Sequence, residues 1–75
     1  MPDRAGQVEE AHTTLKQARA ANPNSVRTLY VLGWAAQQVG NIEESREAYQ
    51  SFIALAPSLF AEQKATAARR LQELR

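Results

Sequence analysis

Two pairs of adjacent glutamates are the residues of this chain best suited by type to acid–base chemistry. Glu9 and Glu10 form the first pair, and Glu43 and Glu44 form the second. Two carboxylates held side by side can divide the work of a general acid and a general base. Each pair, however, is expected in the first turn of a helix, where the helix macrodipole stabilises negative charge. The glutamates therefore favour a structural role, and we predict no catalytic residues.

The sequence also lacks the residue patterns needed for a metal site or for nucleophilic catalysis. His12 is the single histidine and the sequence has no cysteine, so no second strong metal ligand accompanies it. We expect His12 to be a solvated helix residue. The serines have no nucleophile-elbow context, and there is no glycine-rich phosphate-binding loop. The sequence thus predicts a protein that is not an enzyme and uses no metal or other cofactor.

The composition narrows the class of partner. The 75 residues allow one domain, and their formal net charge of +1 gives no strong positive field of the kind that attracts nucleic acids. The longest apolar stretches, YVLGWAA and FIALA, fall well short of the roughly 20 residues that span a bilayer. The polar start MPDRAGQ is unlike a secretory signal. We therefore expect a cytoplasmic protein with neither nucleic-acid nor membrane partners.

Glycine and proline residues divide the chain into four segments with helical periodicity. Apolar residues recur at spacings of three and four in these segments, which indicates amphipathic helices over 7–21, 26–39, 42–55 and 58 to the C-terminus. The residues expected to face inward are Val8, Ala11, Leu15 and Ala18; Val26, Leu29, Leu32, Ala36 and Val39; Ile42, Ser45, Tyr49, Phe52 and Ala56; and Phe60, Ala67, Leu71 and Leu74. The chain is therefore predicted to be all-α, with about four helices.

Short turns between these segments carry residues typical of helix ends. Asn24 or Ser25 is expected to cap the second helix, Asn41 the third and Ser58 the fourth. Gly40 is expected to end the second helix in a left-handed conformation. Because the turn at Gly40 is very short, the second and third helices are predicted to form an antiparallel hairpin.

The sequence repeats itself with a period of 34 residues. GQVEEA at 6–11 and GNIEES at 40–45 have this spacing, and the glycine of each is expected to mark a turn before a helix. Further identical pairs at the same separation are Glu9 and Glu43, Glu10 and Glu44, Ala20 and Ala54, and Pro23 and Pro57. Gly33 lies inside the second helix at a cost of about 1 kcal/mol relative to alanine, which indicates that another helix crosses close to its backbone.

A 34-residue period built from a helical hairpin resembles the tetratricopeptide repeat family. The family pattern W-x2-L-G-x2-Y, then A-x3-F, then P, is matched here by Leu29, Leu32, Gly33, Ala36, Ser45, Tyr49 and Pro57. Leu29, Ala36 and Ser45 depart from the family residues, and all three departures are changes of packing. The resemblance implies an α-solenoid built of antiparallel helical hairpins.

The resemblance also implies a layout for a single domain over 1–75. It makes 6–23 the second helix of a partial repeat, 24–57 a complete repeat and 58–75 a capping helix. The last helix is expected to cap the stack because Gln63, Thr66 and Arg70 stand where a further repeat would need apolar or small side chains. Nothing in residues 1–5 can supply a helix to pair with the first segment, so we expect the N-terminal end of the stack to be open.

Proteins of this family hold a peptide or partner segment in a concave groove lined by the first helix of each repeat. By resemblance, the groove-facing positions here are Arg27, Tyr30, Val31, Trp34, Gln37 and Gln38. Tyr30 and Trp34 lie one turn apart and off the apolar stripe, so we expect them to share a face that the core does not need. The open alternative is that Trp34 packs against the first or fourth helix. The family's clamp for C-terminal carboxylates has only Arg27 as a counterpart, so that specificity is not expected.

These features predict a non-catalytic module that binds a protein or peptide, or that helps to scaffold a complex. The alternatives are a structural module that self-associates as a homodimer through the open first helix and the aromatic face, or an accessory repeat fragment of a larger protein. RNA recognition by related helical repeats is not expected, because it needs several repeats and a more basic face. The basic stripe near the C-terminus is interrupted by glutamates and expected to be solvated; it comprises Lys64, Arg69, Arg70 and Arg75.

Overall fold

Four α-helices and one short 3-10 helix make up the structure, a computed structural model that describes residues 4–74. Their bounds are α1 Arg4–Ala21, α2 Val26–Gln38, α3 Ile42–Leu55, η1 Ser58–Phe60 and α4 Ala61–Glu73. The described residues contain no strand, so the all-α prediction is confirmed. The bounds of α2 and α3 agree with prediction to within one residue, whereas α1 begins before the expected residue 7.

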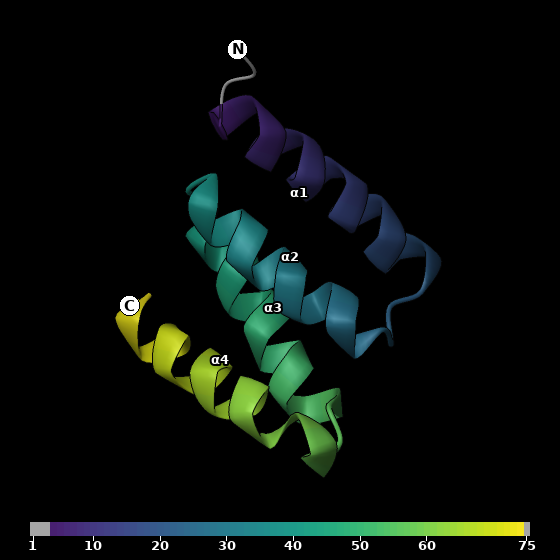
Figure 1. Cartoon of the computed structure of the whole chain (residues 1–75), viewed down its shortest axis with the longest axis vertical. Helices are drawn as coiled ribbons and strands as arrows, with labels where there is room; N and C mark the ends of the chain where they lie inside the picture. Colours follow the sequence, from purple (N-terminus) through teal and green to yellow (C-terminus); the bar gives the residue numbers. More distant parts are fainter. Residues whose placement is uncertain (1–3, 75) are drawn as a thin grey trace.

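The α2–α3 hairpin is the centre of the molecule. The two helices run antiparallel, and α1 and α4 lie on opposite sides of the hairpin (Figure 1). α1 packs chiefly on α2, whereas α4 packs chiefly on α3. Each helix is therefore covered by its neighbours in the sequence, which is the arrangement of a stack of helical hairpins.

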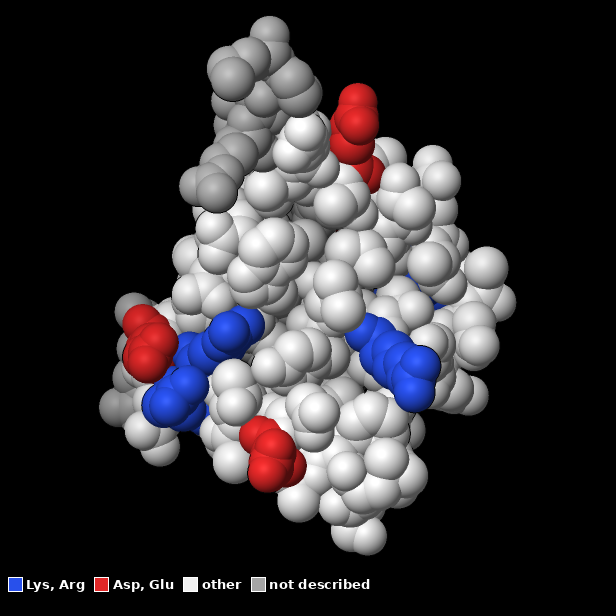
Figure 2. Space-filling model, viewed as in Figure 1, with Lys and Arg blue, Asp and Glu red and all other residues white. Residues whose placement is uncertain are grey.

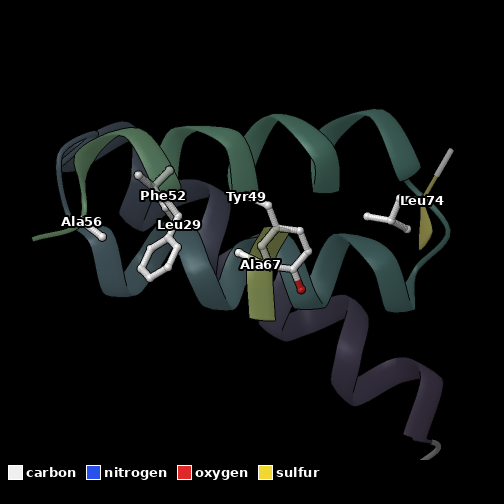
Figure 3. Close-up of a cluster of buried hydrophobic side chains, with 6 residues drawn as sticks. All are labelled: Leu29, Tyr49, Phe52, Ala56, Ala67 and Leu74. Atoms are coloured by element: carbon white, nitrogen blue, oxygen red, sulfur yellow. The ribbon is translucent and has the colours of Figure 1, made fainter. Parts of the chain in front are cut away.

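The hydrophobic core lies between α2 and α3 and reaches α4. Figure 3 shows its central cluster, which comprises Leu29, Tyr49, Phe52, Ala56, Ala67 and Leu74. All six were expected to face inward from their helical spacing. Ile42 and Ala18 were also expected to face inward, but both are exposed, Ile42 to 39%. Ile42 is the first residue of α3 and lies at the turn end of the hairpin, where α2 has already ended.

Gly33 is the point at which a side chain of α3 comes closest to the α2 backbone. A Cβ atom at Gly33 would lie 2.7 Å from Cδ1 and Cε1 of Tyr49, closer than real Cβ contacts come. Beside it, the buried Ser45 hydroxyl donates a 2.7 Å hydrogen bond to the Gly33 carbonyl oxygen, so this polar group has a partner. The predicted close crossing at Gly33 is therefore confirmed.

Most of the predicted helix ends are also confirmed. Ser25 Oγ accepts a hydrogen bond from the Thr28 amide at 3.4 Å, and Asn41 Oδ1 accepts one from the Glu44 amide at 3.3 Å. Gly40 has a φ of 85°, the left-handed conformation that favours glycine. The Gly40 and Asn41 amides donate to carbonyl oxygens of the last turn of α2, which completes a Schellman motif.

Two expectations about helix starts are wrong. Ser58 begins η1 and provides no side-chain cap; the chain enters α4 through a 3-10 turn in which the Phe60 amide donates to the Pro57 carbonyl oxygen at 2.9 Å. Gly6 lies inside α1 instead of marking a turn before it. Within the described residues no helix ends ahead of Gly6, so the left-handed backbone required at Gly40 is not required there.

Candidate functional site

An open pocket lies between the first turns of α2 and α4. Three of the six residues expected to line a groove contribute to it. Its volume is about 390 Å3. The residues that line it are Arg27, Tyr30, Val31, Phe52, Phe60 and Gln63. Because these residues come from α2, α3, η1 and α4, the pocket depends on the docking of α4 against the hairpin.

The floor of the pocket is aromatic. The rings of Tyr30 and Phe52 meet edge to face with centroids 5.0 Å apart, and those of Phe52 and Phe60 do so at 6.1 Å. Tyr30 also packs against the central cluster, so it is half-buried at the edge of the core. The expectation that the core does not need Tyr30 is therefore wrong: a side chain next to Leu29 on α2 is long enough to reach the rings of α3. Edge-to-face pairs of this kind hold their rings in fixed orientations.

The other three expected residues lie outside the pocket. Trp34 is 38% exposed and does not belong to the buried cluster, although one turn of α2 separates it from Tyr30. Gln37 is half-buried and Gln38 is exposed. The structure thus divides the expected face of α2 into a hollow around Tyr30 and a separate surface around Trp34.

The rim of the pocket is polar and carries one cation. Arg27 is exposed, and within the described part of the chain it forms no ion pair. Gln63 supplies a neutral amide from α4, and none of the described residues that line the pocket is acidic. Figure 2 shows one face of the molecule on which charged side chains stand in a few small groups surrounded by uncharged surface, with an acidic and a basic group side by side at one edge.

Three lining residues were not among the expected site residues. Phe52 was assigned to the core, and Phe60 and Gln63 to the capping helix. The 34-residue period could have found the last two, because Phe60 and Gln63 are the equivalents of Val26 and Leu29 on α2. In that register α4 is the equivalent of α2, the groove-lining helix of the complete repeat.

Tyr49, whose ring packs edge to face on Tyr30, joins α3 to α4 through Arg70. An Arg70 Nη1 donates a 2.8 Å hydrogen bond to the Tyr49 hydroxyl, and the guanidinium carbon lies 5.9 Å from the ring centroid. Burial raises the pKa of the Tyr49 phenol above its ordinary value, although the hydrogen bond and charge of Arg70 oppose this. The hydrogen bond to Tyr49 in turn raises the pKa of Arg70.

The basic stripe near the C-terminus is therefore not simply solvated. Arg70 is half-buried, and Lys64 Nζ donates a 3.1 Å hydrogen bond to the Ala56 carbonyl oxygen near the end of α3. Arg69 is exposed, as expected, and Arg75 lies outside the described residues. Two of the four basic residues thus fasten α4 to α3.

On the opposite side of the hairpin, α1 is joined to α3 by two polar pairs. His12 Nε2 pairs with Glu44 Oε1, and Arg19 Nη2 donates a 2.9 Å hydrogen bond to Glu47 Oε1. The expectation of a solvated His12 is wrong, because its side chain is only 14% exposed. The two glutamates of the second pair differ in their surroundings, since Glu44 contacts His12 while Glu43 is exposed.

Comparison with known protein families matches the repeat pattern. A sequence model described as tetratricopeptide repeat matches residues 4–72. The chain belongs to the tetratricopeptide repeat family. Membership of this family indicates a role in protein–protein interaction. No curated protein and no solved structure gives a significant match to the chain.

The tetratricopeptide repeat pattern describes the packing of this hairpin. All of its helical positions are buried, namely Leu29, Leu32, Gly33, Ala36, Ser45 and Tyr49, whereas Pro57 is exposed in the turn after α3. The departure at Ser45 is accommodated because its hydroxyl bonds the Gly33 carbonyl oxygen. Within residues 4–74, no helix has the length and apolar character needed to cross a bilayer.

Proposed function

We propose that this chain is a non-catalytic interaction module that binds a peptide segment of a partner protein across the start of α2 and the start of α4. The pocket formed by Arg27, Tyr30, Val31, Phe52, Phe60 and Gln63 is the observation that carries the proposal. An apolar, pre-formed hollow with a few polar groups at its edge is the usual form of a binding site. The family relationship supports a protein or peptide as the occupant.

The roles of the helices follow from the repeat register. In this proposal α1, most of which falls in 6–23, is the second helix of a partial repeat, and α2 and α3 form the complete repeat within 24–57. α4, within 58–75, acts as the capping helix. It also contributes Phe60 and Gln63, at its entry and first turn, to the pocket. Capping and binding are thus two roles of one helix.

Val31 offers the sharpest test of the proposed surface. Its side chain is 42% exposed and lines the pocket, so Val31→Gln should disturb a bound segment without opening the core. Peptides selected from a random library on the wild-type protein should bind Val31→Gln at least about fivefold more weakly, a loss of about 1 kcal/mol.

Leu59→Gln is the matched control for this experiment. Leu59 is 79% exposed and does not line the pocket, so the same change of chemistry should leave peptide binding unaltered. Trp34→Ala then tests whether the bound segment continues along α2. Equal binding by wild type and Val31→Gln, measured by fluorescence polarisation, would show that the pocket is not the binding surface.

Self-association is a second candidate function, and the packing of α1 favours it. None of the α1 side chains that the structure describes is buried, so this helix retains surface that a second copy can cover. Small helical modules often gain stability in this way. Sedimentation equilibrium at micromolar concentration should then give a dimer, whereas a folded monomer would remove this candidate.

A further inference from the structure

We propose that the pocket selects peptide segments in which a large apolar side chain stands next to an acidic one. The inference rests on the proposed function and specifies its partner. The apolar side chain fills the hollow over the aromatic floor, and the neighbouring carboxylate meets Arg27 at the rim. The proposal concerns an acidic side chain within a segment and does not require a chain terminus.

The need for an apolar anchor follows from the walls of the pocket. Tyr30 and Phe60 are half-buried aromatic walls that pack on the buried Phe52 ring, and Val31 adds an aliphatic side chain that is 42% exposed. A volume of about 390 Å3 admits one large side chain together with some of its backbone. Placing a leucine-sized group there removes apolar surface from water on both partners.

The preference for a carboxylate follows from the lack of an ion pair at Arg27. Three other basic side chains are engaged within the molecule: Arg19 with Glu47, Lys64 with the Ala56 carbonyl oxygen, and Arg70 with the Tyr49 hydroxyl. Lys16, Arg46 and Arg69 are exposed without an ion pair among the described residues, but they do not line the pocket. Arg27 lines the pocket, and within the described residues it has no ion pair and no acid lies beside it in the pocket lining. A guanidinium beside an apolar surface binds a carboxylate more strongly than one surrounded by water, because the local dielectric constant is lower.

The position of Arg27 in its helix points the same way. α3 has Glu43 and Glu44 in its first turn and α4 has Glu62, as the helix macrodipole favours. α2 has no acid in its first turn and instead carries Arg27 as its second residue. A cation at this end weakens the helix, but it adds to the positive potential of the helix terminus and so attracts an anion. Arg27 therefore lowers the stability of α2 slightly but strengthens the attraction of this helix end for a negatively charged partner.

The test uses three short blocked peptides with the same glycine–serine flanks. Their central residues are Leu-Asp, Leu-Asn and Ser-Asp, and each is titrated into 15N-labelled full-length protein. We expect Leu-Asp to shift the amide resonances of Arg27, Tyr30, Val31 and Phe60. Leu-Asn should bind about threefold to fivefold more weakly, as suits a pair at an exposed rim, and Ser-Asp at least about tenfold more weakly.

Two arginine variants assign the preference to its residue. Arg27→Gln should remove the difference between Leu-Asp and Leu-Asn while keeping the preference for Leu over Ser. Arg69→Gln, a control at an exposed position of α4 outside the pocket, should keep both preferences. Equal effects of the two variants would overturn the assignment to Arg27.

The outcomes separate this inference from the proposed function on which it rests. Equal affinities for Leu-Asp and Leu-Asn, with both peptides in the pocket, would overturn the acidic preference and leave the binding surface intact. A fourth peptide that binds only with a free C-terminal carboxylate would likewise overturn the assignment to an acidic side chain. If no peptide shifts the pocket resonances at millimolar concentration, both proposals fail.

Discussion

α1 and α4 flank the same hairpin but are attached to it by different means. α4 contributes the buried Ala67 to the central cluster, and the buried Leu74 follows directly after its end. α1 is longer, yet none of its described side chains is buried, and its links to α3 include the His12–Glu44 and Arg19–Glu47 pairs.

The difference shows how one repeat period can give helices with unequal roles. Burial of apolar area contributes far more to stability than partly exposed polar pairs do. The helix held by burial is also the one that adjoins the pocket, since Phe60 joins the core cluster and lines the pocket at the same time. The proposed binding surface therefore lies on the firmly packed side of the hairpin.

The largest expected contrast between the two sides is between Phe52→Ala and Leu15→Ala. Phe52 is 1% exposed and contacts the α4 side, so its truncation should lower the free energy of unfolding by about 3–5 kcal/mol. Leu15 is half-buried on α1, and its truncation should cost about 1–2 kcal/mol. Urea denaturation followed by circular dichroism measures both. Equal losses would mean that α1 is packed as firmly as α4.

A smaller effect should come from the polar tie between α3 and α4. Tyr49→Phe removes the hydroxyl that Arg70 contacts and should cost about 0.5–1.5 kcal/mol. Because burial raises the pKa of Tyr49, the folded state holds the phenol proton more tightly than the unfolded state. The stability that this raised pKa contributes is complete below the unfolded pKa of about 10 and is lost as the pH rises through the folded pKa.

The pH dependence reports the burial of the Tyr49 phenol, an effect on the pKa that Arg70 opposes. Urea denaturation at about pH 8 and about pH 11 should show wild type losing more stability than Tyr49→Phe over that interval. The same alkaline loss in both proteins would contradict the role given to Tyr49.

The smallest effect is expected for the polar pair on the α1 side. The His12 and Glu44 side chains are 14% and 19% exposed, and a pair of this kind contributes about 0.5–1 kcal/mol. A double-mutant cycle with His12→Ala and Glu44→Ala isolates that coupling energy. A second cycle measures the coupling energy between Tyr49 and Arg70. If the His12–Glu44 coupling energy is the larger of the two, the polar contact on the α1 side is stronger than the one on the α4 side, contrary to expectation.

Local rules explain why much of the fold could be predicted from the sequence. Helical spacing placed Leu29, Tyr49 and Phe52 in the core, and the caps at Ser25 and Gly40 depend on residues within one turn. The 34-residue period predicted which helices pair as the complete repeat. It failed at Gly6, because equal spacing does not ensure equal surroundings.

The parts that were not predicted depend on distances between helices. His12 and Glu44 are 32 residues apart in sequence, and nothing local shows that α1 brings them together. The reach of Tyr30 into the core also depends on where α3 lies. The pocket itself needs α4 to dock, so sequence reasoning found its α2 residues and missed Phe60 and Gln63.

The central claim is that this chain binds its partner on the α4 side of the hairpin, and a chemical-shift map tests it most directly. A library-selected peptide is titrated into 15N-labelled protein. The account predicts that the shifted amide resonances cluster at Arg27, Tyr30, Val31, Phe60 and Gln63, while those of α1 stay in place. Shifts concentrated on α1, with the pocket residues unmoved, would contradict it.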